Sequence, residues 1–261
     1  MGRSAQQTIE SPGRETSVCL TKLSLVRTID VCLSPPLLPL HDISEKTVVV
    51  VDILRATSSM VTAFAHGMSR IRPVAHIDEC LELQRQGYLT AGERDGIKIT
   101  EFDFGNSPLD YRQTSFEGKS LAMTTTNGTL AIEQSKAASQ LVIGAFLNVS
   151  AVADFLKQQI HDVLVVCAGW KGHVNLEDTL FAGALLDSVS PQIQAGSDAA
   201  LMAKTIYHEA QPDCLAFLSQ SSHVQRLTNM GLMGDIAFCL QQDTYSLVPQ
   251  LQGSDLVVPT D

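Results

Sequence analysis

The fold is decided by residues 47–59, which read TVVVVDILRATSS. Four consecutive valines without polar alternation predict a strand that is buried on both faces, as in a sheet covered by helices. Thr57, Ser58 and Ser59 can each cap a helix, and the apolar residues that follow fit its buried face. The stretch therefore predicts a strand, a charged turn with Asp52 and Arg55, and a helix.

Asp52 and Arg55 are the first candidates for chemistry. In open α/β sheets, ligands bind outside the carboxyl ends of the strands, which is where these two side chains would lie. A buried acid is costly unless it has a partner or a metal. The alternative is structural: the two residues would form a buried ion pair that joins the strand to the helix. This stretch alone leaves both interpretations open.

The rest of the chain alternates between strand and helix signals. Residues 33–42 contain three prolines and are predicted to form an ordered, extended connector. The alternation is typical of an α/β fold with a largely parallel or mixed sheet between helix layers. Further strands are expected over residues 23–33, 71–75, 88–91, 119–123, 141–145, 163–167 and 246–248. Helices are expected up to residue 66 and over 77–86, 130–138, 149–159, 177–186 and most of 197–242, with breaks at Gly231 and Gly234.

The composition limits the number of domains and the classes of partner. The chain has 261 residues, of which 44% are hydrophobic, and a formal net charge of −10. Nonspecific binding to nucleic acid or to an anionic membrane needs basic patches, so neither is expected. Residues 1–22 are polar and are predicted to form a flexible tail ahead of a single α/β domain over residues 23–261. The sequence leaves the oligomeric state open, and a homo-oligomer is compatible with it.

The cysteines and the hydropathy pattern bear on the compartment. Six cysteines are scattered along the chain without a C-x-x-C pair, which excludes zinc-ribbon and thioredoxin-type sites. Scattered thiols are typical of a reducing cytosol. No apolar run approaches the roughly 18 residues that span a bilayer, and a signal-peptide pattern is lacking. We therefore expect a cytoplasmic protein.

Residues 124–129, TTTNGT, are the most unusual polar stretch. They follow a predicted strand and open a predicted helix, so they offer hydroxyls and backbone N–H groups where an anion can bind. Gly128 would let the backbone approach such a ligand closely. The alternative is a strand of threonines followed by an ordinary Asn-Gly turn and a capped helix.

Two other strand-end loops carry acids. Glu93 and Arg94 lie in a glycine-flanked turn, and Glu177 and Asp178 begin a predicted helix. Each pair has a structural alternative, namely a solvated charged turn for the first and a helix cap for the second. Mg²⁺ usually takes one or two protein carboxylates, so these acids and Asp52 are not all expected to be ligands.

Several well-known phosphate-binding patterns are missing. Haloacid-dehalogenase-type phosphatases need Asp-x-Asp at the first strand end, but position 54 is Leu. Cysteine phosphatases need Cys-x5-Arg, but the sixth residue after Cys167 is His173. A P-loop is also absent. Residues 105–108, GNSP, would suit a substrate loop, although such loops are common.

Taken together, the ordered motifs resemble the 2-phosphosulfolactate phosphatase family. The match runs from about residue 24 to residue 249. It is carried by VDILRAT (51–57), GER (92–94), FGNSP (104–108), TTTNGT (124–129), FLN (146–148), CAG (167–169), EDT (177–179) and Gly183. Near the end it also includes Ser222-His223, Leu227, Gly231, Asp235-Ile236, Cys239, Asp243 and Val248-Pro249.

The resemblance implies a Mg²⁺-dependent hydrolase with a three-layer α/β/α fold. It would release phosphate from 2-phospho-3-sulfolactate to give 3-sulfolactate, a reaction of sulfonate metabolism that includes coenzyme M biosynthesis. The expected catalytic residues are Asp52, Arg55 and Glu93, and the expected metal ligands are Asp52, Glu177 and Asp178. The expected substrate-binding residues are Arg94, Asn106, Ser107, Thr124, Thr125, Thr126, Asn127, Gly128, Thr129 and Gly169.

Two alternatives accompany this assignment. Ser58 and Ser59 stand where the family usually shows more threonine, and the tail is extra, although neither departure touches a polar motif. Close relatives could still differ in substrate, so a related small anionic phosphoester is one alternative. The protein could also bind a phosphorylated metabolite without catalysis.

Overall fold

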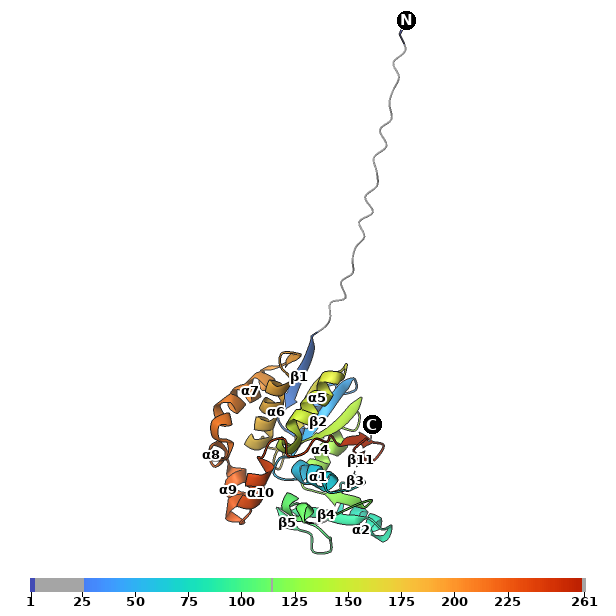
Figure 1. Ribbon diagram of the computed structural model, residues 1–261, viewed down its shortest axis with the longest axis vertical. Helices are drawn as coiled ribbons and strands as arrows, with labels where there is room; N and C mark the ends of the chain where they lie inside the picture. Colours follow the sequence, from blue (N-terminus) through green and yellow to red (C-terminus); the bar gives the residue numbers. More distant parts are fainter. Residues whose placement is uncertain (3–25, 114, 260–261) are drawn as a thin grey trace.

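The computed structural model describes residues 1–2, 26–113 and 115–259. Within them the chain forms an 11-stranded mixed sheet in a three-layer α/β arrangement (Figure 1). The predicted tail falls mainly on residues 3–25, outside the described residues. In that described part, no helix is both long and apolar enough to cross a membrane.

The strands and helices follow the predicted alternation along most of the chain. The strands are β1 (Arg27–Cys32), β2 (Lys46–Val51), β3 (Arg70–Pro73), β4 (Leu89–Arg94), β5 (Ile97–Lys98), β6 (Ser120–Thr124), β7 (Gln140–Gly144), β8 (Asp162–Cys167), β9 (Ile193–Ala195), β10 (Gln250–Gln252) and β11 (Asp255–Val257). The α-helices are α1 (Ala56–Ala65), α2 (Ile77–Arg85), α3 (Pro108–Arg112), α4 (Gly128–Gln134), α5 (Val149–Gln158), α6 (Leu176–Val189), α7 (Asp198–Ala210), α8 (Cys214–Leu218), α9 (Ser222–Asn229) and α10 (Met233–Cys239). The short 3-10 helices are η1 (Pro35–Leu40), η2 (Phe146–Asn148) and η3 (Gln211–Asp213).

The sheet consists of two parallel groups joined by a hairpin. The order is β5-β4-β6-β3-β11-β10-β7-β2-β8-β1-β9. Strands β7, β2, β8, β1 and β9 are parallel to one another, and so are β4, β6 and β3. The β10–β11 hairpin pairs antiparallel with both groups, so the two groups run in opposite directions. The sheet is therefore mixed, which confirms one of the two forms that the sequence predicted.

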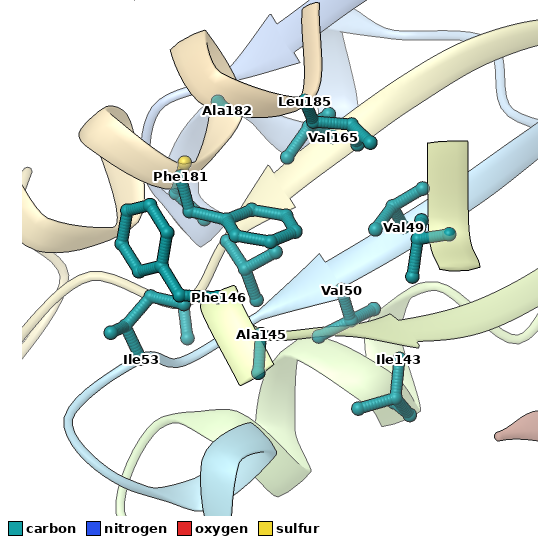
Figure 2. Packing of buried hydrophobic residues seen from close by; sticks show 14 of the residues in the cluster. Val49, Val50, Ile53, Ile143, Ala145, Phe146, Val165, Phe181, Ala182 and Leu185 are labelled. Carbon is teal, nitrogen blue, oxygen red and sulfur yellow. The ribbon is translucent and has the colours of Figure 1, made fainter. Parts of the chain in front are cut away.

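The core is built around β2. It pairs in parallel with β7 on one side and β8 on the other, and residues 48–51 are fully buried. β-branched valines suit a pleated strand with helices packed over it. Figure 2 shows Phe181 and Leu185 of α6 on the same side of the strands as Val165. Helices α5, α6 and α7 pack in sequence, whereas α1 and α4 form another group that contacts β7 and β2.

The structure corrects several local expectations. The connector predicted to be extended is the 3-10 helix η1, because its first two residues are prolines with φ already fixed for a helical turn. Strand β4 continues through Arg94, and the turn lies instead at Asp95 and Gly96, both with positive φ. Gly231 does separate two helices, but Gly234 lies inside α10.

The final strands also differ from the prediction. Residues 246–248 form no strand, and the sheet pairing begins only where the Ile143 N–H donates to the Pro249 carbonyl. The β10–β11 hairpin follows, with Gly253 at a positive φ in its turn. Strand β9 was not predicted, because its three residues are too short to give a periodic signal.

Candidate active site

A narrow cleft lies where the carboxyl ends of strands from both groups converge. Helix α9 lies on its other side, beside the β4–β5 hairpin (Figure 1). The lining residues come from six places along the chain, and most are polar. They are Asp52, Leu54, Arg55, Glu93, Asp95, Gly96, Asn106, Thr126, Asn127, Trp170, His223, Arg226 and Leu227.

Asp52 follows β2 directly and lies in the cleft with only 6% of its surface exposed. Its Oδ1 accepts a hydrogen bond of 3.3 Å from the backbone N–H of Ala56. Burial raises the pKa of the Asp52 carboxyl to about 6, and the negative charges of Glu93 and Glu177 add to the rise. This carboxyl can therefore gain or lose a proton near neutral pH.

Arg55 forms the buried ion pair that the sequence allowed, but with a different partner. Its guanidinium pairs with the carboxylate of Asp235 on α10, and both side chains are about 5% exposed. It also donates to the Gly96 carbonyl at 3.3 Å. The Ser107 hydroxyl donates to the same Asp235 carboxylate at 2.7 Å. Ser107, which was predicted to bind substrate, therefore contacts a protein side chain in this structure. Arg55 thus lines the cleft with its charge already matched.

Glu93 and Arg94 point in opposite directions, as adjacent strand residues do. Glu93 faces the cleft, and its two oxygens accept hydrogen bonds from the Thr126 N–H at 2.8 Å and the Gly96 N–H at 2.6 Å. Arg94 donates instead to the Thr124 hydroxyl at 3.1 Å and is not among the residues that line the cleft. Its position therefore does not favour the predicted contact with substrate.

The stretch 124–129 divides into two kinds of residue. Thr125 and Thr129 satisfy each other, because the Thr125 hydroxyl accepts from the Thr129 N–H and the Thr129 hydroxyl accepts from the Thr125 N–H, both at 3.1 Å. Thr126 and Asn127 line the cleft. Gly128 packs so closely on Asp52 that an added Cβ would lie 2.8 Å from its Oδ2. The stretch contributes to the cleft through its middle residues.

Asp178 and Glu177 start α6 but have different surroundings. The two oxygens of Asp178 accept backbone hydrogen bonds from Ile53 at 2.9 Å and Gly169 at 3.0 Å, so this acid ties together two strand-end loops. Glu177 is fully buried, and its Oε1 lies 2.5 Å from Nδ1 of His223. Its other oxygen has no hydrogen-bond partner within the described residues. The contacts thus favour a positioning role for Asp178 and leave Glu177 one free acceptor.

Gly169 contributes to the backbone rather than to the lining of the cleft. It has a φ of +61°, and a Cβ there would lie 2.3 Å from the His173 carbonyl oxygen. A glycine is therefore required for the tight turn that presents the next residue, Trp170, to the cleft.

The sequence interpretation missed residues that come from the C-terminal helices. His223 and Arg226 line the cleft from α9, and the ring of His223 stacks on Trp170 with 5.7 Å between centroids. Asp235 anchors Arg55 from α10. His223 and Asp235 belong to motifs that carry the family resemblance. They lie in helices rather than directly after a strand, so the local sequence pattern does not link them to the cleft. Only the tertiary fold brings these helices to the site.

The site is rich in oxygen atoms, which are the ligands that Mg²⁺ prefers. Among the described residues, no three His, Cys, Asp or Glu side chains are grouped in a way that would hold one. Three buried oxygens at the site nevertheless have no hydrogen-bond partner there, on Asn106, Thr126 and Glu177. Asp52 adds a carboxylate to the lining of the cleft. Mg²⁺ binds one or two carboxylates and otherwise waters and substrate oxygens, so residues of this chemistry suit it.

The comparisons with known proteins decide the family. The family model described as 2-phosphosulpholactate phosphatase matches residues 32–254. The chain belongs to this 2-phosphosulpholactate phosphatase family. It is 39% identical over 213 residues to a probable 2-phosphosulfolactate phosphatase of Thermotoga maritima, covering 82% of this chain and 92% of that protein.

Other family members match over similar lengths. Proteins with the same printed name from Clostridium tetani and Caldanaerobacter subterraneus are 36% and 38% identical, over 85% and 81% of this chain. The alignments cover 96% and 90% of those two proteins. The family is named for the hydrolysis of a phosphoric monoester, and the resemblance carried by the sequence motifs is confirmed.

Proposed function

We propose that this protein hydrolyses 2-phospho-3-sulfolactate to 3-sulfolactate and phosphate in a Mg²⁺-dependent reaction. The observation that carries the proposal is the cleft at the strand ends, where buried Asp52, Arg55 and Glu93 meet in a chain of the 2-phosphosulpholactate phosphatase family. The printed names of the relatives support the substrate. The substrate and product are small anions, and most of the residues that line the cleft are polar.

The reaction has a simple balance. A bond forms between phosphorus and an oxygen that derives from water, and the bond between phosphorus and the ester oxygen on C2 breaks. Water gives up a proton, and the ester oxygen leaves as the hydroxyl of 3-sulfolactate. In the cleft without a cation, the carboxyl of Asp52 has a pKa of about 6, so it loses its proton readily when a positive charge binds beside it.

The other residues position the reacting groups. Glu93 fixes the loop that carries Thr126 and the turn that carries Gly96, and it thereby shapes two walls of the cleft. Arg55 presents a guanidinium edge whose position is set by Asp235. Such prearranged donors stabilise the charge of a phosphoryl group without reorganisation during the reaction.

Mg²⁺ would be held by Asp52 and Glu177, completed by substrate oxygens and water. When bound, it would neutralise charge on the phosphoryl oxygens. The unpartnered oxygen of Glu177 and the raised pKa of Asp52 support this assignment, since a cation would relieve both.

A panel of phosphoesters tests the proposal. Phosphate release is measured from 2-phospho-3-sulfolactate, 2-phospholactate and 3-phosphoglycerate, in Mg²⁺ and in EDTA. We expect turnover of the first ester in Mg²⁺ and its loss in EDTA. Calorimetric binding without phosphate release would instead establish a non-catalytic binding protein. Preference for another ester would assign a different substrate, and unchanged turnover in EDTA would remove the metal from the proposal.

A further inference from the structure

The cations of the cleft differ in whether their charge is already matched. Arg55 is paired with Asp235, and Arg94 points away from the cleft. Arg226 of α9 lines the cleft and, within the described residues, forms no salt bridge of 4 Å or less with a carboxylate. A protein with a net charge of −10 repels an anionic substrate at long range, so an unmatched guanidinium in the cleft supplies a local attraction for it.

The surroundings of Arg226 hold its guanidinium in place but leave most of its donors free. One Nη donates to the backbone carbonyl of Asp95. The guanidinium lies 5.5 Å from the centre of the Trp170 ring, and that ring is stacked on His223. A guanidinium has five N–H donors, and the described structure gives this one a single hydrogen-bond acceptor. Arg226 is therefore oriented by an aromatic surface while a bidentate edge remains available.

The β4–β5 turn lies opposite Arg226 and leaves room for its guanidinium, because residue 96 is a glycine. Gly96 has a φ of +83°, and a Cβ there would lie 3.4 Å from an Nη of Arg226 and 3.0 Å from Cε of Met230. Asp95 beside it is engaged by Lys171 at 2.8 Å, which leaves the Asp95 carboxylate paired with another cation. The β4–β5 turn thus approaches α9 closely without neutralising Arg226 by a direct ion pair.

We propose that Arg226 binds the sulfonate of the substrate and so determines specificity for sulfonated phosphoesters. This inference rests on the proposed function. On the proposed function the phosphoryl group binds beside Asp52 and the fully buried Glu177, whereas Arg226 reaches the cleft from helix α9. The carboxylate is bonded directly to C2, which bears the ester, but the sulfonate is one methylene farther away. A guanidinium offers the flat donor pair that suits sulfonate oxygens.

The test compares two esters that differ only in the sulfonate. Steady-state kinetics are measured for Arg226→Gln on 2-phospho-3-sulfolactate and on 2-phospholactate, which has the same phosphate and carboxylate. We expect KM for the sulfonated ester to rise about tenfold to a hundredfold, with little change for 2-phospholactate. Arg112→Gln is the matched control, because Arg112 is an exposed arginine against Phe238 and does not line the cleft.

Two further variants keep the test decisive if Arg226→Gln does not fold. Arg226→Lys retains the charge but loses the bidentate edge, and Arg226→Met retains much of the side chain's length and its apolar stem but loses the charge. Both should raise KM selectively for the sulfonated ester. An equal loss on both esters, with a lower melting temperature, would mean that Arg226 only holds α9 against the β4–β5 turn, and would overturn the inference.

The remaining outcomes separate this inference from the proposed function. An effect on 2-phospholactate that is absent for the phosphate ester of 2-hydroxyethanesulfonate would assign Arg226 to the carboxylate and overturn the inference. If the wild-type protein hydrolyses neither ester, the proposed function fails. Calorimetric binding of 3-sulfolactate and lactate then decides about Arg226, because only sulfolactate binding should weaken in the variant.

Discussion

Asp52 places a pH-dependent cost on the folded state. Its carboxyl pKa rises from 3.8 to about 6 on folding, mainly through burial. Below pH 3.8 the carboxyl is protonated in both states and the cost is absent, whereas above pH 6 the folded state holds a disfavoured charge. Two pKa units correspond to about 3 kcal/mol of unfolding free energy.

Asp52→Asn should therefore stabilise the metal-free protein at neutral pH. Denaturant unfolding in EDTA at pH 7.5 should give a higher unfolding free energy for the variant, by at most about 3 kcal/mol. The gain should shrink as the pH falls toward 4. An equal difference at both pH values would contradict the account of this carboxyl.

Cys167 lies beside the site but should not act as a nucleophile. It ends β8 and is fully buried, and burial raises the pKa of its thiol well above the ordinary value. The thiolate needed for attack is therefore scarce at neutral pH. Cys167→Ser should retain most of the wild-type kcat, with a lower melting temperature from the polar hydroxyl in the core. A folded variant without turnover would reverse this assignment.

At the scale of elements, one buried ion pair attaches α10 to the start of α1. Asp235 accepts from Arg55 and from the Ser107 hydroxyl, so it joins three segments. Asp235→Asn leaves a buried guanidinium without its countercharge and should lower the unfolding free energy by about 3–5 kcal/mol. The control is Asp154→Asn, which breaks an exposed pair with Lys157 and should cost less than about 1 kcal/mol.

Urea unfolding of both variants measures this difference. The two substitutions are the same in chemistry, and each breaks one ion pair, so the contrast isolates burial. Equal midpoints for Asp235→Asn and Asp154→Asn would mean that the Arg55–Asp235 pair does not hold the two helices together.

The elements also show which sequence signals suffice. The valine run of β2 predicted a buried strand because no amphipathic alternative competes with it. The helices predicted to end at residues 66 and 86 are each followed by a glycine, Gly67 and Gly87, with the positive φ that other residues avoid. Gly234 lies inside α10 instead, because a glycine is tolerated there at a modest cost when the helix packs well.

For the whole molecule, the sequence predicted the strand-end half of the site and missed the helical half. Asp52, Glu93 and Thr126 each follow or end a strand, so local pattern and the strand-end rule place them in the cleft. Arg226 lies in a helical region with no chemical motif of its own. Its role depends on α9 packing across from the β4–β5 turn, a long-range contact that no local period encodes.

The direction of the two strand groups was also beyond the sequence. The short β10–β11 hairpin reverses the sheet between β7 and β3, and each of its outer pairings involves a single pair of residues. The cleft nevertheless receives residues from both groups, Asp52 after β2 and Glu93 near the end of β4. A pairing of one residue with one residue leaves no periodic pattern in the sequence. The relative direction of the two strand groups therefore could not be predicted from the sequence.

Asp52 is expected to take part in the hydrolysis of 2-phospho-3-sulfolactate by holding the cation in the cleft. This role is tested by measuring kcat for wild type and Asp52→Asn on that ester in saturating Mg²⁺, with folding of both checked by thermal melting. We expect turnover by the wild type and a fall of about a hundredfold to ten-thousandfold in a folded variant, because the cation's charge stabilisation is worth several kcal/mol. Turnover of Asp52→Asn at the wild-type rate would show that Asp52 has no part in the reaction.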